Sequence, residues 1–211
     1  VVKIAAIHNN KKALDIFARE IAQAATGMAP GLTGIVGGRP KSFPRIRLFS
    51  TLVDKASVQA TVDIAGEKVN SAQPAGLPLD SSALPVHNGE STAGSVAVPL
   101  VKLAWARSGD KGNHANIGVI ARKAEYLPFL RAALTEQAVA GFMQHVLDPQ
   151  TGSVSRWDLP GFNAMNFLLK NALGGGGIAS LRIDPQGKAF AQQLLDFPVP
   201  VSAEIAKEVN A

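Results

Sequence analysis

The chain has 211 residues, and its 46% hydrophobic and 18% charged residues are typical of a globular protein and exclude a disordered one. It has no cysteine, which excludes disulfides, a thiolate nucleophile and cysteine-ligated metals, and which fits a reducing cytoplasm. No apolar run is long enough to span a membrane, and the net charge of +5 comes from scattered Lys and Arg without interleaved aromatic residues, so we expect neither a membrane nor a nucleic acid as partner.

The first third of the chain combines a predicted strand and a predicted helix. Residues 1–7 are rich in β-formers and predict a buried strand, and residues 11–25 place apolar side chains at helical spacing. Asn9 or Asn10 would cap this helix, and Gly27 would end it. Because the sequence opens directly in a strand and without Met, we expect the natural protein to be longer, with an N-terminal region that is missing here.

A predicted hairpin and a linker follow. Residues 45–53 and 58–64 alternate at period two and would pair through a turn at 54–56. Residues 71–96 are rich in Ser, Ala, Pro and Gly and read as an inter-domain linker. We therefore expect a first unit at 1–70 and a second at 97–211.

The second unit alternates predicted strands and helices irregularly, which favours an α+β fold built from two small α/β sandwich units. The predicted strands are 98–106, 115–121, 153–159, 178–183 and 199–201, and the predicted helices are 126–147, 162–173, 188–195 and 203–209. Residues 107–114 would form a loop between two strands, and Thr135 would cap a second helix within 126–147.

The segment from Arg107 to Gly118, RSGDKGNHANIG, concentrates polar residues around flexible glycines. Its glycines, Gly109 and Gly112, would let backbone N–H groups approach a ligand closely, and Arg107 and Lys111 favour an anion. The alternative is a tight turn in which Asp110 pairs with a neighbouring base. The glycine spacing fits neither a Walker loop nor a dinucleotide fingerprint.

Two other glycine-rich segments leave similar alternatives open. Residues 174–177 are four consecutive glycines, including Gly175 and Gly176. They would allow either close approach of the backbone to a ligand or another chain, or a flexible turn with close helix–strand packing. Residues 28–40 would either bind through Thr33 and Arg39 or pack on the missing N-terminal region.

The four histidines, His8, His87, His114 and His145, show no metal-binding spacing, so no metal site is predicted. Of these, only His114 lies inside the polar segment, where it is a candidate acid or base. His145 would interact with a helix C-terminus, and His8 would make a structural hydrogen bond.

The stretches LAWARSGDKGNHANIGVIAR and LPGFNAMNFLLKNALGGGGIASLRIDPQGKAFAQQLLDFPV resemble the C-terminal ferredoxin-like domain of the acyclic terpene utilisation (AtuA) family. VVKIAAIHNN and APGLTGIVGGRPK are similar to the end of the larger N-terminal domain of that family. The resemblance implies a ferredoxin-like second unit, with an antiparallel or mixed sheet covered by helices. It also implies a cytoplasmic role in the breakdown of acyclic terpenes and branched acids.

Two functions follow as hypotheses. In the first, the protein is an enzyme, a lyase, hydratase or hydrolase, acting on an acyl-CoA or a small carboxylic acid. Its catalytic residues would be Asp110, His114 and Lys111, and its substrate-binding residues Arg107, Ser108, Gly109, Gly112, Asn113, Asn116, Gly175 and Gly176. In the second, the region is a non-catalytic module for homo-oligomerisation or for docking to an acyl-CoA enzyme. The sequence does not indicate which cofactor, if any, the protein uses.

Overall fold

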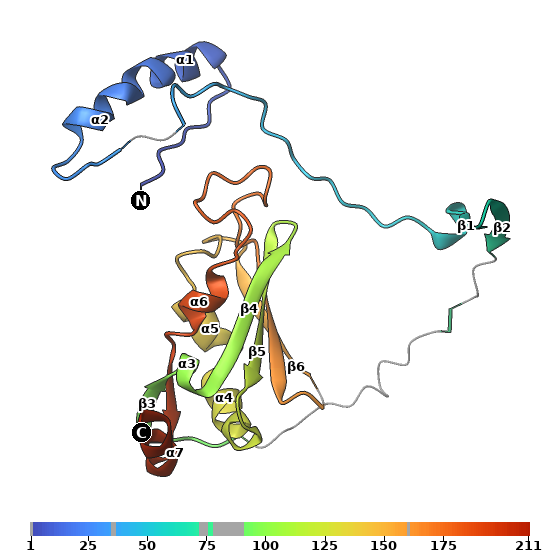
Figure 1. Cartoon of the computed structure of the whole chain (residues 1–211), viewed down its shortest axis with the longest axis vertical. Coiled ribbons are helices and arrows are strands. Elements are labelled where there is room, and N and C mark those ends of the chain that lie inside the picture. Colours follow the sequence, from blue (N-terminus) through green and yellow to red (C-terminus); the bar gives the residue numbers. More distant parts are fainter. Residues whose placement is uncertain (1, 35–36, 72–75, 78–90, 160) are drawn as a thin grey trace. The chain divides into compact units, whose positions relative to one another are not determined.

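The computed structural model describes residues 2–34, 37–71, 76–77, 91–159 and 161–211 (Figure 1). The chain divides into two compact units, Val1–Arg47 with Gly89–Ala211, and Leu48–Asn88. Among the described residues, no helix has both the length and the apolar character needed to cross a membrane.

The predicted N-terminal helix is confirmed. It comprises α1 (Lys11–Glu20), η1 (Ile21–Gln23) and α2 (Ala24–Gly27). The Asn10 side chain caps α1 by accepting a hydrogen bond from the Lys12 N–H at 2.9 Å. The strand expected over 1–7 is wrong, because residues 2–7 are irregular and pair with no strand in the described chain.

The predicted hairpin is displaced along the sequence. Strand β1 (Ala60–Ile64) pairs with β2 (Glu67–Ser71) through a turn in which Ala65 and Gly66 have φ of 52° and 93°. Two positive φ values are the mark of a type I′ hairpin turn. Residues 45–53 form no strand, and η2 (Lys55–Ser57) occupies the expected turn. Most of the expected linker lies outside the described residues.

The C-terminal domain, residues 96–211, has an α+β fold, which confirms the fold class. Its main sheet is antiparallel with strand order β4-β5-β7-β6, and β3 pairs with β8 in a second, two-stranded sheet. The strands are β3 (Val96–Pro99), β4 (Ala104–Lys111), β5 (His114–Ala121), β6 (Ser153–Leu159), β7 (Ala164–Lys170) and β8 (Pro198–Val201). The helices are α3 (Leu100–Leu103), η4 (Ala124–Tyr126), α4 (Leu127–Ala133), α5 (Glu136–Phe142), α6 (Phe190–Leu194) and α7 (Ala203–Asn210).

The core lies between one face of the main sheet and the helices. Ile117, Phe167 and Leu169 point to that face and are fully buried. Helices α4, α5 and α6 pack on the same side (Figure 1). Every member of the main buried cluster lies between Val98 and Ala206, so this domain has its own hydrophobic core.

The helix expected over 162–173 is wrong, because residues 164–170 form strand β7. Met165, Phe167 and Leu169 are buried at period two, as in a half-covered strand. Asn163 and Asn171 have φ of 49° and 50°, and this left-handed backbone at each end is incompatible with one continuous helix.

Two further strand predictions are wrong. The strand expected over 98–106 is split by the helical turn α3, and residues 178–183 form turns with Ile178 and Ile183 exposed. In contrast, the predicted break at Thr135 is confirmed. The Thr135 hydroxyl accepts a hydrogen bond from the Ala138 N–H at 3.1 Å and starts α5.

Candidate functional site

Most of the predicted binding loop is sheet. Residues 107–111 belong to β4 and residues 114–118 to β5, so only Gly112 and Asn113 form the turn. Gly112 has a φ of 66°, as expected for the first residue of a type II′ turn. Because side chains alternate along a strand, the polar residues of this segment divide between the two faces of the sheet.

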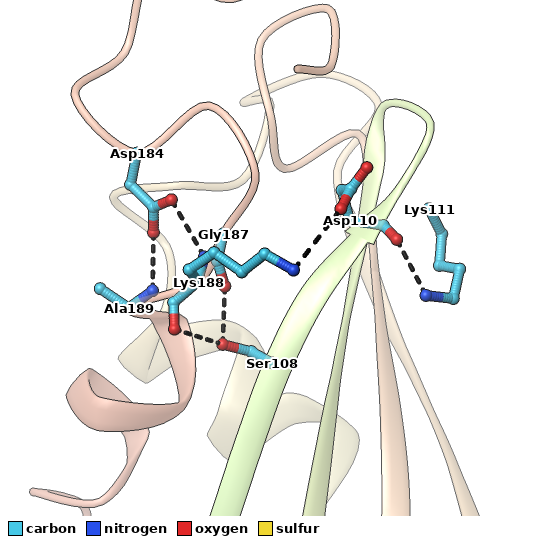
Figure 2. Close-up of polar contacts among 7 residues, drawn as sticks. All are labelled: Ser108, Asp110, Lys111, Asp184, Gly187, Lys188 and Ala189. Atoms are coloured by element: carbon cyan, nitrogen blue, oxygen red, sulfur yellow. Dashed lines mark hydrogen bonds and ion pairs between the residues drawn. The ribbon is translucent and has the colours of Figure 1, made fainter.

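Ser108 points to the helix-covered face and is buried (Figure 2). Its hydroxyl donates to the carbonyl of Gly187 at 2.6 Å and lies 3.2 Å from the carbonyl of Lys188. It also accepts from the Ala191 N–H at 2.9 Å. The hydroxyl thus attaches β4 to the start of α6, and it does not point to a ligand surface.

Asp110 also points to the helix side, at the edge strand of the sheet. Its carboxylate lies 3.9 Å from the ammonium of Lys188. Asp184 accepts hydrogen bonds from the backbone N–H groups of Lys188 and Ala189, and the Lys111 ammonium donates to the carbonyl of Asp110 at 2.9 Å (Figure 2). Asp110 thus lies beside a neighbouring base, the partly exposed Lys188 ammonium.

Two of the three glycine-containing segments singled out from the sequence, 107–118 and 174–177, lie against each other. The Asn113 side-chain oxygen accepts from the Gly175 N–H at 2.6 Å, and the Asn113 carbonyl accepts from the Ala172 N–H at 3.0 Å. A Cβ on Gly176 would lie 2.7 Å from the carbonyl oxygen of Gly112. Glycine is needed at 176 because two backbone segments approach closely there.

His114 lies on the sheet face opposite to Asp110. Its Nδ1 accepts a hydrogen bond from the Asn171 N–H at 2.9 Å, so the neutral ring carries its proton on Nε2. Asp110 and His114 are thus not brought together as an acid–base pair. His145 contacts Gln193, and His87 lies outside the described residues.

The face of the main sheet opposite to the helices is called the open face here, because no described element of the C-terminal domain packs over it. The strand register aligns its side chains in rows that cross the sheet. Row one holds Trp105, Ile120, Ala164 and Leu159; row two Arg107, Gly118, Asn166 and Trp157; row three Gly109, Asn116, Leu168 and Ser155; row four Lys111, His114, Lys170 and Ser153.

Large apolar side chains gather at one end of the open face. Trp105, Ile120, Trp157 and Leu159 are 54%, 48%, 50% and 42% exposed. The Arg122 guanidinium lies 4.6 Å from the centre of the Trp105 ring, a cation–π contact at the border of the face. An exposed apolar cluster of this kind marks a surface that contacts a ligand or another chain.

The polar side chains of the open face are mainly hydrogen-bond donors. It carries Arg107, Lys111 and Lys170 and no Asp or Glu. The Asn166 side-chain oxygen already accepts from the Asn116 amide at 3.3 Å, so the Asn166 NH₂ group remains as a donor. This arrangement is suited to hold an anion beside an apolar group.

Of the open-face residues, Arg107, Lys111, His114 and Asn116 are predicted as site residues from the sequence, whereas the two tryptophans and Asn166 are not. The alternation of Trp105, Arg107 and Lys111 along one strand was the available signal for part of this set. Asn166 was assigned to a helix, and the strand that carries Trp157 pairs with a strand that was not predicted.

The groups with shifted pKa lie away from the open face. The pKa of Glu208 is lowered by hydrogen bonds from Lys123 and Tyr126, and the pKa of Lys123 is raised by its contact with Glu208. Burial raises the pKa of Tyr126. Hydrogen bonds from Thr151 lower the pKa of Asp148. Glu208, Lys123 and Tyr126 connect α7 to η4. Asp148 and Thr151 stabilise the turn at 148–151.

Residues 98–200 match the model of the AtuA ferredoxin-like domain. The C-terminal domain belongs to this family. The match extends from β3 to β8 and includes every strand of the open face, so the AtuA resemblance and the ferredoxin-like fold are confirmed. No curated protein and no solved structure matches the chain.

Proposed function

We propose that this protein acts in the cytoplasmic degradation of acyclic terpenes and branched acids, and that its AtuA domain binds a branched carboxylic acid or acyl-CoA on the open face. The observation that carries the proposal is the gradient across that face. Half-exposed apolar side chains lie at one end, with Trp105, Ile120 and Leu159 in row one and Trp157 in row two. The cations Arg107, Lys111 and Lys170 lie in rows two and four, and no row contains a carboxylate.

The apolar end supplies the attraction for a hydrocarbon chain. Trp105, Ile120 and Leu159 present apolar surface to water, and covering it stabilises a complex by about 25 cal/mol per Å² before the costs of association. A branched chain suits this end because its short, wide shape covers flat indole and aliphatic surface.

The cationic end supplies the attraction for the charged group. Rows one and four are six residues apart along a strand, which is about 20 Å at ~3.4 Å per residue. An anionic head can therefore contact Arg107 or reach as far as Lys111 and Lys170 while its apolar part stays on row one. With no carboxylate on the face, nothing repels the head.

An enzymatic role would draw its proton-transfer group from the same face. His114 supplies the imidazole of the open face, the side-chain type that enzymes use most often for proton transfer, and it lies opposite Lys111 in row four. Asp110 would contribute only through its ion pair with Lys188. The proposed reaction classes are those of a lyase, hydratase or hydrolase.

Fluorescence tests the proposal directly, because the only two tryptophans of the chain both lie on the open face. The full chain is titrated with 3,7-dimethyloctanoate, 3-methylbutanoate and the coenzyme A thioester of 3-methylbutanoate. Binding is expected to shift tryptophan emission to shorter wavelength, because half-exposed indoles lose contact with water.

Variants Trp105→Phe and Trp157→Phe assign the signal to each indole, and Lys12→Met in α1 is the control for loss of a cation outside the face. No change in emission across the panel would remove support for ligand binding here. If single-stranded oligothymidine quenches the emission and none of the acids changes it, the open face would instead be a surface for stacking nucleic-acid bases.

The apolar row also favours a second candidate function, docking of another protein or of a second copy. Its three exposed apolar side chains, Trp105, Ile120 and Leu159, would be covered in a dimer. Sedimentation velocity of the full chain tests this, with Trp157→Arg as the disrupting variant. A dimer that Trp157→Arg converts to monomer supports docking, and a monomer at every concentration argues against homo-oligomerisation.

A further inference from the structure

Gly118 occupies the middle of β5, where regular pairing continues on both sides. It lies opposite Arg107 of β4 and opposite Asn166 of β7, with no bulge in either register. Glycine inside a regular element costs roughly 0.5–1 kcal/mol relative to Ala because its backbone loses more freedom on folding. A glycine here therefore needs an explanation.

The domain itself does not require glycine at this position. Gly118 is not among the residues with positive φ, and a Cβ built on it would meet no atom closer than the Arg107 carbonyl oxygen at 4.0 Å. Gly176 contrasts with it, because a Cβ there would collide with backbone at 2.7 Å. The open space above Gly118 lies on the outer side of the sheet, in the second row of the open face.

Hydrogen-bond donors border this space on both sides. Arg107 and Asn166 lie on the two strands next to Gly118, about 10 Å apart at ~4.8 Å per strand. No carboxylate pairs with Arg107 in the described chain, and the Asn166 NH₂ group makes no hydrogen bond to a described residue. Two donors facing a space without a side chain form a suitable position for a small acceptor group.

We infer that Gly118, Arg107 and Asn166 form the binding position of a free carboxylate, whose hydrocarbon chain runs toward Trp105 and Ile120. This inference rests on the proposed function and specifies its ligand class. A guanidinium binds a carboxylate through two parallel hydrogen bonds, and the amide adds a third. The missing Cβ at 118 lets the carboxylate approach the sheet.

The geometry selects the free acid over its thioester. Row one begins only two residues along the strand from this position, about 7 Å away, so the charge must lie directly at the end of the hydrocarbon. A free branched acid has this form. In a coenzyme A thioester the acyl carbonyl is uncharged, and the phosphates are separated from the acyl chain by the long pantetheine arm.

The decisive variant is Gly118→Val in the full chain. Valine favours strands, and its Cβ would meet no atom closer than the Arg107 carbonyl oxygen at 4.0 Å, so thermal unfolding is expected at an unchanged or higher temperature. Its side chain fills the carboxylate position, so affinity for 3,7-dimethyloctanoate, measured by calorimetry, is expected to fall at least tenfold. Gly118→Ala is the smaller replacement if the valine variant folds poorly.

Two further variants test whether the effect depends on where the valine is placed and on the charge of Arg107. Ser153→Val adds the same branched side chain to row four of the same face and should leave the affinity unchanged. Arg107→Met keeps an unbranched side chain close in size to the aliphatic part of arginine, removes the charge, and should weaken binding of 3,7-dimethyloctanoate about tenfold or more. The same change should have no effect on 3,7-dimethyloctanamide, which carries no charge.

Each outcome decides one question. Unchanged affinity of Gly118→Val for 3,7-dimethyloctanoate overturns the carboxylate position while ligand binding on the open face stands. Tighter binding of the coenzyme A thioester than of the acid, or displacement of the acid by inorganic phosphate at equal concentration, overturns the choice of a free carboxylate. Failure of the unaltered chain to bind any member of the panel overturns the inference and the proposed function together.

Discussion

Ser108 is the only buried polar side chain in the described chain, and its hydroxyl makes all its contacts with backbone groups next to α6. It lies beside Arg107 in the sequence and on the opposite face of the sheet. Neighbouring residues of one polar segment thus serve different purposes, one holding the domain together and the other facing the solvent.

Replacement of Ser108 by Ala should lower the free energy of unfolding by about 1–3 kcal/mol, because the buried Gly187 carbonyl and Ala191 N–H both lose their partner. Urea unfolding measures the change, with Ser153→Ala on the exposed end of β6 as a control expected to stay within ~0.5 kcal/mol. Full stability combined with lost ligand binding would show instead that Ser108 contacts ligand.

The lowered pKa of Glu208 predicts how the stability of the fold depends on pH. Its pKa is lowered in the folded protein by Lys123 and Tyr126, so its stabilising effect is present above the unfolded pKa of about 4.3 and is lost as pH falls through the lower folded value. Glu208→Gln should therefore melt at a lower temperature than the unaltered chain at pH 7. The two melting temperatures should converge as pH falls below the lowered pKa of Glu208 in the folded protein. A constant gap down to pH 3 would contradict this assignment.

The β4–β5 hairpin and the 171–177 segment illustrate how one element fixes another. Asn113 at the tip of the hairpin binds backbone groups of Ala172 and Gly175, so two loops that are distant in sequence form one rigid end of the domain. The glycines of this end serve backbone packing, whereas Gly118 faces outward.

Adjacent glycines provide a matched test of this packing. Gly176→Ala should cost at least ~1–2 kcal/mol, because it combines a φ of 82° with a Cβ 2.7 Å from the Gly112 carbonyl. Gly177→Ala meets only the flexible Gln186 side chain at 3.5 Å and should change stability by less than ~0.5 kcal/mol. Equal effects in chemical denaturation would contradict close packing at 176.

Hydrophobic periodicity in the sequence predicts correctly those helices and strands whose pattern fits only one type of secondary structure. Thr135 and its acidic first turn predicted the start of α5, and the alternation at 115–121 predicted β5. Residues 162–173 satisfied two patterns at once, since Met165 and Leu169 suit a helix face and also, with Phe167, a strand face. The left-handed backbone at Asn163 and Asn171 decides between them, and sequence periodicity carries no information on it.

The candidate site was predictable only in part for the same reason. Arg107 and Lys111 stand out in the sequence as cations near glycines. Trp157 and Asn166 join them through strand pairing, which depends on the register of residues more than 40 positions away and leaves no local pattern.

At the scale of the whole molecule, the hydrophobic core belongs to one part of the chain. All members of the main buried cluster lie within 98–206, and Ala18 is the only buried residue among those described before 96. Residues 91–211 should therefore fold alone, with one cooperative urea transition whose midpoint is close to that of the full chain. A broad, non-cooperative transition would show that residues 2–71 are required for the fold.

Pairing of β3 with β8 brings the entrance and the exit of the AtuA domain side by side, since Val96 lies opposite Val201. A unit whose two ends meet can be inserted into a surface loop of another protein, or circularly permuted by joining those ends and opening the chain at the turn around Gly161. Residues added before β3 likewise need not separate the strands of the sheet that carries the open face.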